Sequence, residues 1–128
     1  MHEVGIMQST LEIALEWANR QGAQRIHRLG MRVGALSGVV PDALDFAFEV
    51  LRQGTPAEGA CLEVEFIPLR IYCPACDREF SPDGYWYTCP ECNGVDTQVR
   101  QGRELEIAFV EVSGEGEADE SHAGTLDS

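Results

Sequence analysis

The sequence predicts an α+β fold in which two helices pack on a three-stranded mixed sheet, with a four-cysteine module inserted before the last strand. Three observations predict it. Two segments carry apolar residues at helical spacing, three segments alternate apolar and polar residues, and four cysteines stand in two C-P-x-C motifs. With 128 residues, 44% of them hydrophobic, the chain is large enough for one such domain and a small module.

Two amphipathic helices are predicted, one over residues 6–21 and one that begins at Pro41. The apolar faces comprise Leu11, Ala14, Leu15 and Ala18 in the first helix and Leu44, Ala47, Phe48 and Leu51 in the second. Gly22 suits the left-handed position that follows a helix. Proline is favoured at the first helical position, and Gly54 with Pro56 ends the second helix.

Three strands are predicted where apolar and polar residues alternate. The apolar sets are His27, Leu29, Met31 and Val33 in QRIHRLGMRVG, Leu62, Val64 and Phe66 in ACLEVEFIP, and Leu105, Ile107 and Phe109 in RELEIAFVEV. We expect each set to form one face of its strand. Residues 1–69 plus 98–112 are then the α+β domain, residues 70–97 are the cysteine module, and residues 113–128 are a disordered acidic tail.

The charge is strongly negative. The chain has 9 basic residues, all of them Arg, against 22 acidic residues, for a net charge of −13. Such a surface repels phosphate backbones, so we expect no nucleic-acid partner. It suits protein partners or metal cations. No apolar run has the length of a membrane span, and the start lacks the pattern of a signal peptide, so we expect a cytoplasmic protein without membrane contact.

The module contains two C-P-x-C knuckles separated by twelve residues, and their cysteines are Cys73, Cys76, Cys89 and Cys92. Two knuckles can close a tetrahedral shell of four sulfurs, which is typical of structural zinc, although iron accepts the same shell. Four thiolates leave no open coordination position, so the site is predicted to fold the module and not to catalyse. We expect a hairpin between the knuckles, with its turn at Pro82–Gly84.

The remaining candidate residues have weaker signals. The aromatic residues of the module are Tyr72, Phe80, Tyr85, Trp86 and Tyr87. We expect them to pack around the metal or to form a protein-docking face, because Arg78 is the only base between Cys73 and Asp96. Cys61 is expected to be a half-buried small residue and His27 a structural one. His122, in the acidic tail, is expected to bind metal weakly at most.

Taken together, these motifs resemble the HypA/HybF family of hydrogenase maturation proteins, which help to deliver nickel. The resemblance rests on the MHE start, the first helix, a strand ending in VG, the G-A-L-S-G-V-x-P-x-A-L-x-F-A-F stretch and the late CPxC…CPxC module. It extends from Met1 to about Val112 in order and without large gaps.

The resemblance implies a nickel metallochaperone, not an enzyme, with a labile Ni(II) site at the amino terminus and structural Zn(II) in the module. It assigns the imidazole of His2 and the backbone nitrogens of His2 and Glu3 to nickel, with the Glu3 side chain in contact with the site. Family members often carry a polar residue where this chain has Val40, and Asp42 is the nearby substitute. The implied partners are the nickel-handling GTPase HypB and the hydrogenase large subunit.

The chemistry of the first residues supports the same interpretation. The α-amine of Met1, two amides and an imidazole form fused chelate rings that suit square-planar Ni(II) or Cu(II). Binding should weaken as the pH falls through roughly 6 to 7, because a coordinating imidazole is neutral. The alternative is a zinc-ribbon protein adaptor with an inert amino terminus. Both a monomer and a homodimer are compatible with the sequence.

Overall fold

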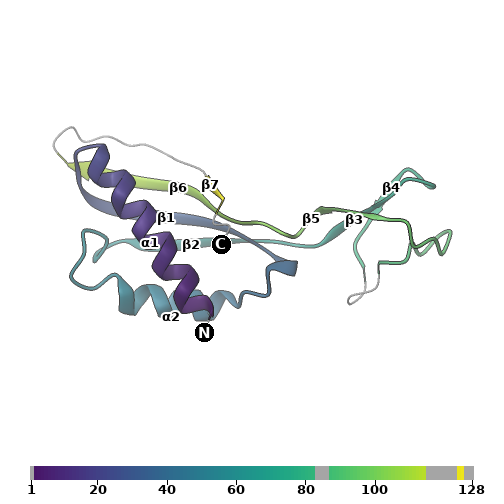
Figure 1. Cartoon of the computed structure of the whole chain (residues 1–128), viewed down its shortest axis with the longest axis horizontal. Helices are drawn as coiled ribbons and strands as arrows, with labels where there is room; N and C mark the ends of the chain where they lie inside the picture. Colours follow the sequence, from purple (N-terminus) through teal and green to yellow (C-terminus); the bar gives the residue numbers. More distant parts are fainter. Residues whose placement is uncertain (1, 83–86, 115–123, 126–128) are drawn as a thin grey trace.

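The computed structural model describes residues 2–82, 87–114 and 124–125. The molecule is elongated, with an α+β body at one end and a small ribbon at the other (Figure 1). The helices are α1 (His2–Arg20) and α2 (Pro41–Leu51), and a short 3-10 turn, η1 (Ala35–Ser37), precedes α2. Within the described residues, neither helix is long and apolar enough to cross a membrane.

The strands form two sheets. The sheet of the body has the order β2 (Cys61–Ile67), β1 (Ala23–Gly34), β6 (Leu105–Gly114) and β7 (Gly124–Thr125). The sheet of the ribbon has the order β4 (Arg78–Phe80), β3 (Arg70–Cys73) and β5 (Gln98–Gln101). β1 is parallel to β2 and antiparallel to β6, and α2 makes the crossover that parallel neighbours require. The predicted α+β class with its mixed sheet is confirmed, and the two-residue β7 extends it at the β6 edge.

Both helices cover the same face of the body's sheet, and the core lies between the helices and the sheet (Figure 1). Its fully buried side chains include Met7 and Ala14 of α1, Leu29, Met31 and Val33 of β1, Leu44 and Phe48 of α2, and Ile107, Val110 and Val112 of β6. α1 begins at His2, four residues before the predicted start, so His2 and Glu3 are part of a helix. Gly22, two residues after the last residue of α1, has φ +72°, as its sequence position predicts.

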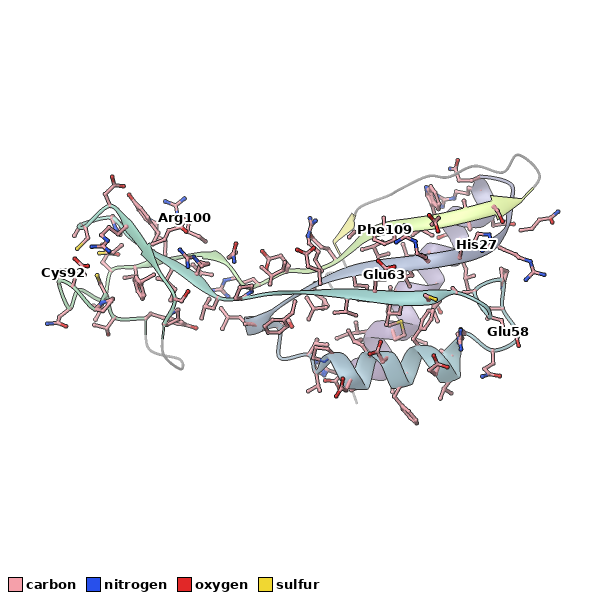
Figure 2. All side chains as sticks on the ribbon, turned by 180° about the vertical axis from the view of Figure 1, so that it is seen from behind. His27, Glu58, Glu63, Cys92, Arg100 and Phe109 are labelled. Carbon is pink, nitrogen blue, oxygen red and sulfur yellow. The ribbon has the colours of Figure 1, made fainter. Side chains whose placement is uncertain are left out.

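The strict alternation predicted for the third strand is wrong at Phe109. Gly30 pairs with Phe109 and Met31 pairs with Ile107, so β6 carries one extra residue at this point. Such a bulge reverses the alternation, and both Ile107 and Val110 therefore face the core. The ring of Phe109 lies instead over Gly30 on the face that the helices leave open (Figure 2).

A second bulge, in β1, moves His27 out of the predicted apolar set. Ile26 pairs with Val112 and Arg28 pairs with Glu111, which leaves His27 as the extra residue. Ile26 is buried, whereas His27 is exposed with its Nε2 atom 2.5 Å from Ser113 Oγ. Phe66 also differs from the prediction: it is exposed, whereas Leu62 and Val64 of the same strand are half-buried.

Ion pairs on the open face of the sheet link three of its strands. The guanidinium of Arg28 donates to Glu63 at 2.9 Å and to Glu111 at 3.0 Å, and it lies 4.8 Å from the ring centre of Phe109. The two carboxylates raise the pKa of Arg28 further above its usual range. Cross-strand pairs of this kind favour one register, so Arg28 helps to align β2, β1 and β6.

The ribbon is joined to the body where β1 ends. The backbone N–H of Gly34 donates to the carbonyl of Glu104 at 2.7 Å, and the N–H of Leu36 donates to the carbonyl of Gly102 at 2.7 Å. A Cβ atom on Gly34 would lie 2.2 Å from the Gly102 oxygen and 2.7 Å from the Glu104 nitrogen. Only glycine therefore allows the two chain segments to approach this closely.

We expect Gly34→Ala to lower the free energy of unfolding by about 1–3 kcal/mol, because the new methyl group meets backbone that must move. The cost is steric, since the backbone of Gly34 is extended with φ −86°. Gly59→Ala is the matched control, because nothing lies within 4 Å of a Cβ there. Urea unfolding followed by circular dichroism measures both variants, and equal stabilities would contradict the close approach.

Candidate metal sites

The ribbon brings the four predicted cysteines together. One ligand atom from each of Cys73, Cys76, Cys89 and Cys92 lies within 4.8 Å of the others. The Sγ atoms of Cys73 and Cys92 are 3.7 Å apart, and those of Cys89 and Cys76 are 3.9 Å apart. A tetrahedral zinc with Zn–S bonds near 2.3 Å holds its sulfurs about 3.8 Å apart, so this arrangement fits a four-thiolate zinc site. Cys61 is exposed at the start of β2, contrary to the expected half-burial, and is not part of the cluster.

Each knuckle turns through a residue in the left-handed conformation. Asp77 has φ 53° and Asn93 has φ 58°, and each directly follows the second cysteine of its motif. Asn and Asp adopt this conformation more readily than other residues with a Cβ atom. In the second knuckle, the N–H of Asn93 donates to the carbonyl of Cys89 at 2.9 Å. An Asp or Asn residue directly after each C-P-x-C motif is the sequence signal for these left-handed turns. The spacing of the cysteines alone does not indicate them.

The thiols have unequal acidities. The pKa of Cys89 is lowered to about 7, because the backbone N–H groups of Cys92 and Glu91 donate to its sulfur. The pKa of Cys76 is raised to about 12, because its thiol is hydrogen-bonded to Cys92 and partly removed from water. Four thiolates at these distances would repel one another, and a divalent cation removes that repulsion. The donor set therefore suits a metal ion.

Polar contacts hold the ribbon around the cluster. Arg78 of β4 forms an ion pair with Glu91, which links the two knuckles. The guanidinium of Arg100 lies 4.1 Å from the ring centre of Tyr72, whose hydroxyl donates to Asp77 at 2.7 Å. Among the other aromatic residues, Phe80 is half-buried and Tyr87 is exposed. Tyr85 and Trp86 lie outside the described residues, as do Asp83 and Gly84 of the expected turn. Within the described residues, the strand before that turn, β4, pairs with β3.

The amino-terminal candidates stand at the first turn of α1. His2 is exposed, and its Nδ1 atom lies 3.6 Å from Glu3 Oε1. The first backbone N–H groups of a helix have no partner within the helix ladder, and the N–H of Glu3 donates instead to its own carboxylate. Met1 and His122 lie outside the described residues.

Glu3 ties the start of α1 to the start of α2. Its Oε2 atom accepts a hydrogen bond from the Val40 N–H at 3.1 Å, and its side chain is only 15% exposed. Val40 is the N-cap of α2 and makes no side-chain cap of its own. The hydrogen bond from Val40 lowers the pKa of Glu3. This contact joins residues 37 positions apart, so no local sequence pattern indicated it. Asp42 is exposed in the first turn of α2.

The fold and the four-thiol cluster define a small α+β protein with an inserted ribbon whose four cysteines could hold a metal ion. Comparison with known proteins places the chain more closely. Residues 1–112 match a family model described as HypA, hydrogenase/urease nickel incorporation, metallochaperone. The chain belongs to the HypA family, which is one of metallochaperones and not of enzymes.

Sequence relatives and solved structures agree with this assignment. The chain is 48% identical to hydrogenase maturation factor HypA of Picosynechococcus sp. over 112 residues, which cover 88% of this chain and 99% of the relative. It is 44% identical to the factor of the same name from Roseiflexus sp., over 87% of this chain and 91% of the relative.

Two solution structures share the fold. That of the Ni metallochaperone HypA from Helicobacter pylori has a TM-score of 0.62 at 23% identity, and the match covers 88% of this chain and 98% of the other. A second structure of a HypA protein has a TM-score of 0.67 at 24% identity, covering 90% of this chain and 98% of the other.

Removing one sulfur should open the cluster. We expect Cys73→Ser to lose bound zinc and to unfold the ribbon, because the ribbon is too small to build a core of its own. Metal analysis by mass spectrometry and the dispersion of ribbon amide signals in NMR spectra measure both effects. Cys61→Ser is the control and should keep zinc and fold. A Cys73→Ser protein with full zinc content would disprove the four-cysteine assignment.

The Glu3 contact should depend on pH. Because the pKa of Glu3 is lowered in the fold, the contact is present above the ordinary value of 4.5 and is lost as the pH falls through the lower, folded value. In an NMR titration, the Val40 amide signal should therefore follow the ionisation of Glu3. Glu3→Gln should abolish this dependence, whereas the control Glu12→Gln, at an exposed position of α1, should leave it unchanged. If the Val40 amide signal shifted with pH in the Glu3→Gln variant as it does in the native protein, the contact would not form.

Proposed function

We propose that this protein binds Ni(II) at its amino terminus and delivers it to the large subunit of a NiFe hydrogenase during maturation, while the ribbon holds structural zinc. The observation that carries the proposal is the match of residues 1–112 to a nickel-incorporation family. That match includes the MHE start and both knuckles.

The proposed nickel ligands are the α-amine of Met1, the backbone nitrogens of His2 and Glu3, and the His2 imidazole. An exposed imidazole on the first turn of α1 supports this set, because it can turn toward the amides beside it. These nitrogen donors favour a square-planar ion such as Ni(II). The positive end of the α1 dipole opposes a cation, and the nearby Glu3 carboxylate offsets part of this repulsion. Such a balance suits an ion that has to leave again.

Glu3 acts in this proposal as a positioning residue. Its carboxylate is already engaged by the Val40 N–H and faces the His2 ring at 3.6 Å. The hydrogen bond from Val40 to Glu3 also suggests why position 40 does not need a polar side chain. Residue 40 contributes its backbone N–H to this contact and not its side chain. If a further oxygen ligand is used, Asp42 is the candidate from α2, because it lies two residues further along an exposed helical turn.

The zinc ion would be held by Cys73, Cys76, Cys89 and Cys92. Its charge would compensate the four thiolates, and its bonds would cross-link the two knuckles. The four-thiolate shell has no open position, so the metal is structural and the nickel site is separate. We place the protein in the cytoplasm, with the nickel-handling GTPase HypB and the hydrogenase large subunit as partners.

A nickel titration tests the proposal. We expect the native protein to bind about one Ni(II), and His2→Ala and a protein with residues added before Met1 to bind it at least about tenfold more weakly. Extension removes the α-amine, whereas His2→Ala removes the imidazole and leaves the amine. Isothermal titration calorimetry measures all three proteins, and His27→Ala is the control for loss of a histidine. Equal affinities would refute the amino-terminal site and favour a zinc-ribbon adaptor with an inert start.

A further inference from the structure

α2 carries two apolar stripes, although only one of them is covered. The inner stripe consists of Leu44, Ala47, Phe48 and Leu51 and packs into the core. The outer stripe consists of Ala43, Phe46 and Val50, which recur at spacings of three and four residues and so share one side of the helix. A helix that is apolar on two sides is normally covered on both.

The outer stripe is open to solvent. Phe46 is 72% exposed and Val50 is 55% exposed, and both stand one helical turn apart. α2 lies at the margin of the body, at the bottom of the view in Figure 1, with α1 and the sheet to its other side. A phenylalanine and a valine side by side on an open helix face are typical of an interaction site and not of a solvated surface.

Acidic residues line one flank of this stripe. Asp42, Asp45 and Glu49 also recur every three or four residues, so their side chains follow the same edge of α2. Glu49 pairs with Arg52 at 2.7 Å, while Asp42 and Asp45 have no ion pair with any described residue. Two copies of this face would bring like charges together, which disfavours self-association. A partner with Lys or Arg along one wall of an apolar groove complements it.

The stripe begins beside the proposed nickel site. The contact between Glu3 and Val40 sets the start of α1 against the start of α2. Phe46 is six residues after Val40, which is about 9 Å along a helix. A protein seated on the outer stripe would therefore lie close to His2.

We propose that the outer stripe of α2 is the docking surface for the protein that exchanges nickel with this chain, and that this partner offers an apolar groove with basic residues along one wall. The identity of the cargo rests on the function proposed above, whereas the contact itself does not. Phe46 and Val50 are the anchors, in the manner of a helix laid in a groove. Asp42 and Asp45 supply steering and register.

Binding measurements with purified HypB and with the purified precursor of the hydrogenase large subunit test this surface. We expect the double variant F46S/V50S to lose at least about thirtyfold in affinity for one of the two proteins. V95S is the matched control, because Val95 is 79% exposed but lies on the ribbon. The affinity of this variant for both proteins should not change. Asp45→Lys should also weaken binding and reduce its salt dependence, whereas the control Glu58→Lys, at an exposed position outside α2, should not.

The same variants separate this proposal from the nickel site. F46S/V50S should bind Ni(II) with the affinity of the native protein and unfold at the same urea concentration, since exposed side chains contribute little to stability. His2→Ala should lose nickel binding and keep its affinity for the partner, so that a failure of the nickel site and a failure of the surface are distinguishable. Unchanged affinity of F46S/V50S for both proteins, or no binding of either to the native chain, would overturn it. A native homodimer that F46S/V50S converts to a monomer would overturn it in favour of self-association.

Discussion

The pairing of β1 with both of its neighbours determines where every other part of this protein lies. One face of β1 contributes Leu29, Met31 and Val33 to the core, and the other face presents Arg28 to carboxylates of β2 and β6. The parallel pairing with β2 requires a crossover, which α2 provides. At its end, Gly34 lies against Gly102 and Glu104, so the same strand also sets the position from which the ribbon leaves the body.

The two candidate metal sites lie in opposite physical settings. The ribbon surrounds its four thiols with left-handed turns, an ion pair between the knuckles and a stacked arginine, which suits an ion that stays. The amino-terminal site has an exposed imidazole on the first turn of a helix and one carboxylate that is already hydrogen-bonded. Fewer preformed contacts suit an ion that has to be released. The fold keeps the two candidate sites on separate units, one on the body and one on the ribbon.

Local patterns predicted much of this structure because their causes are local. Helical periodicity and the proline at position 41 indicated both helices, and alternation indicated three strands. The C-P-x-C spacing predicted the thiol cluster, since each pair of cysteines is brought together by its own turn. The bulges beside Ile107 and at His27 were not predictable in this way. They depend on how two strands 75 or more residues apart fit over one core, and that fit put Phe109 and His27 on the open face.

The amino terminus shows the same division. The sequence by itself determined which donors stand at the start of the chain, and family resemblance assigned them to nickel. Only the tertiary structure decided that Glu3 meets the backbone of Val40, because the contact depends on two helices packing against one sheet. The second apolar stripe of α2 was likewise present in the sequence as Phe46 and Val50. Helical periodicity had predicted that Leu44, Ala47, Phe48 and Leu51 form the buried face. Only the tertiary structure decided that Phe46 and Val50 stay uncovered, since a helix buries only the side that it turns toward the sheet.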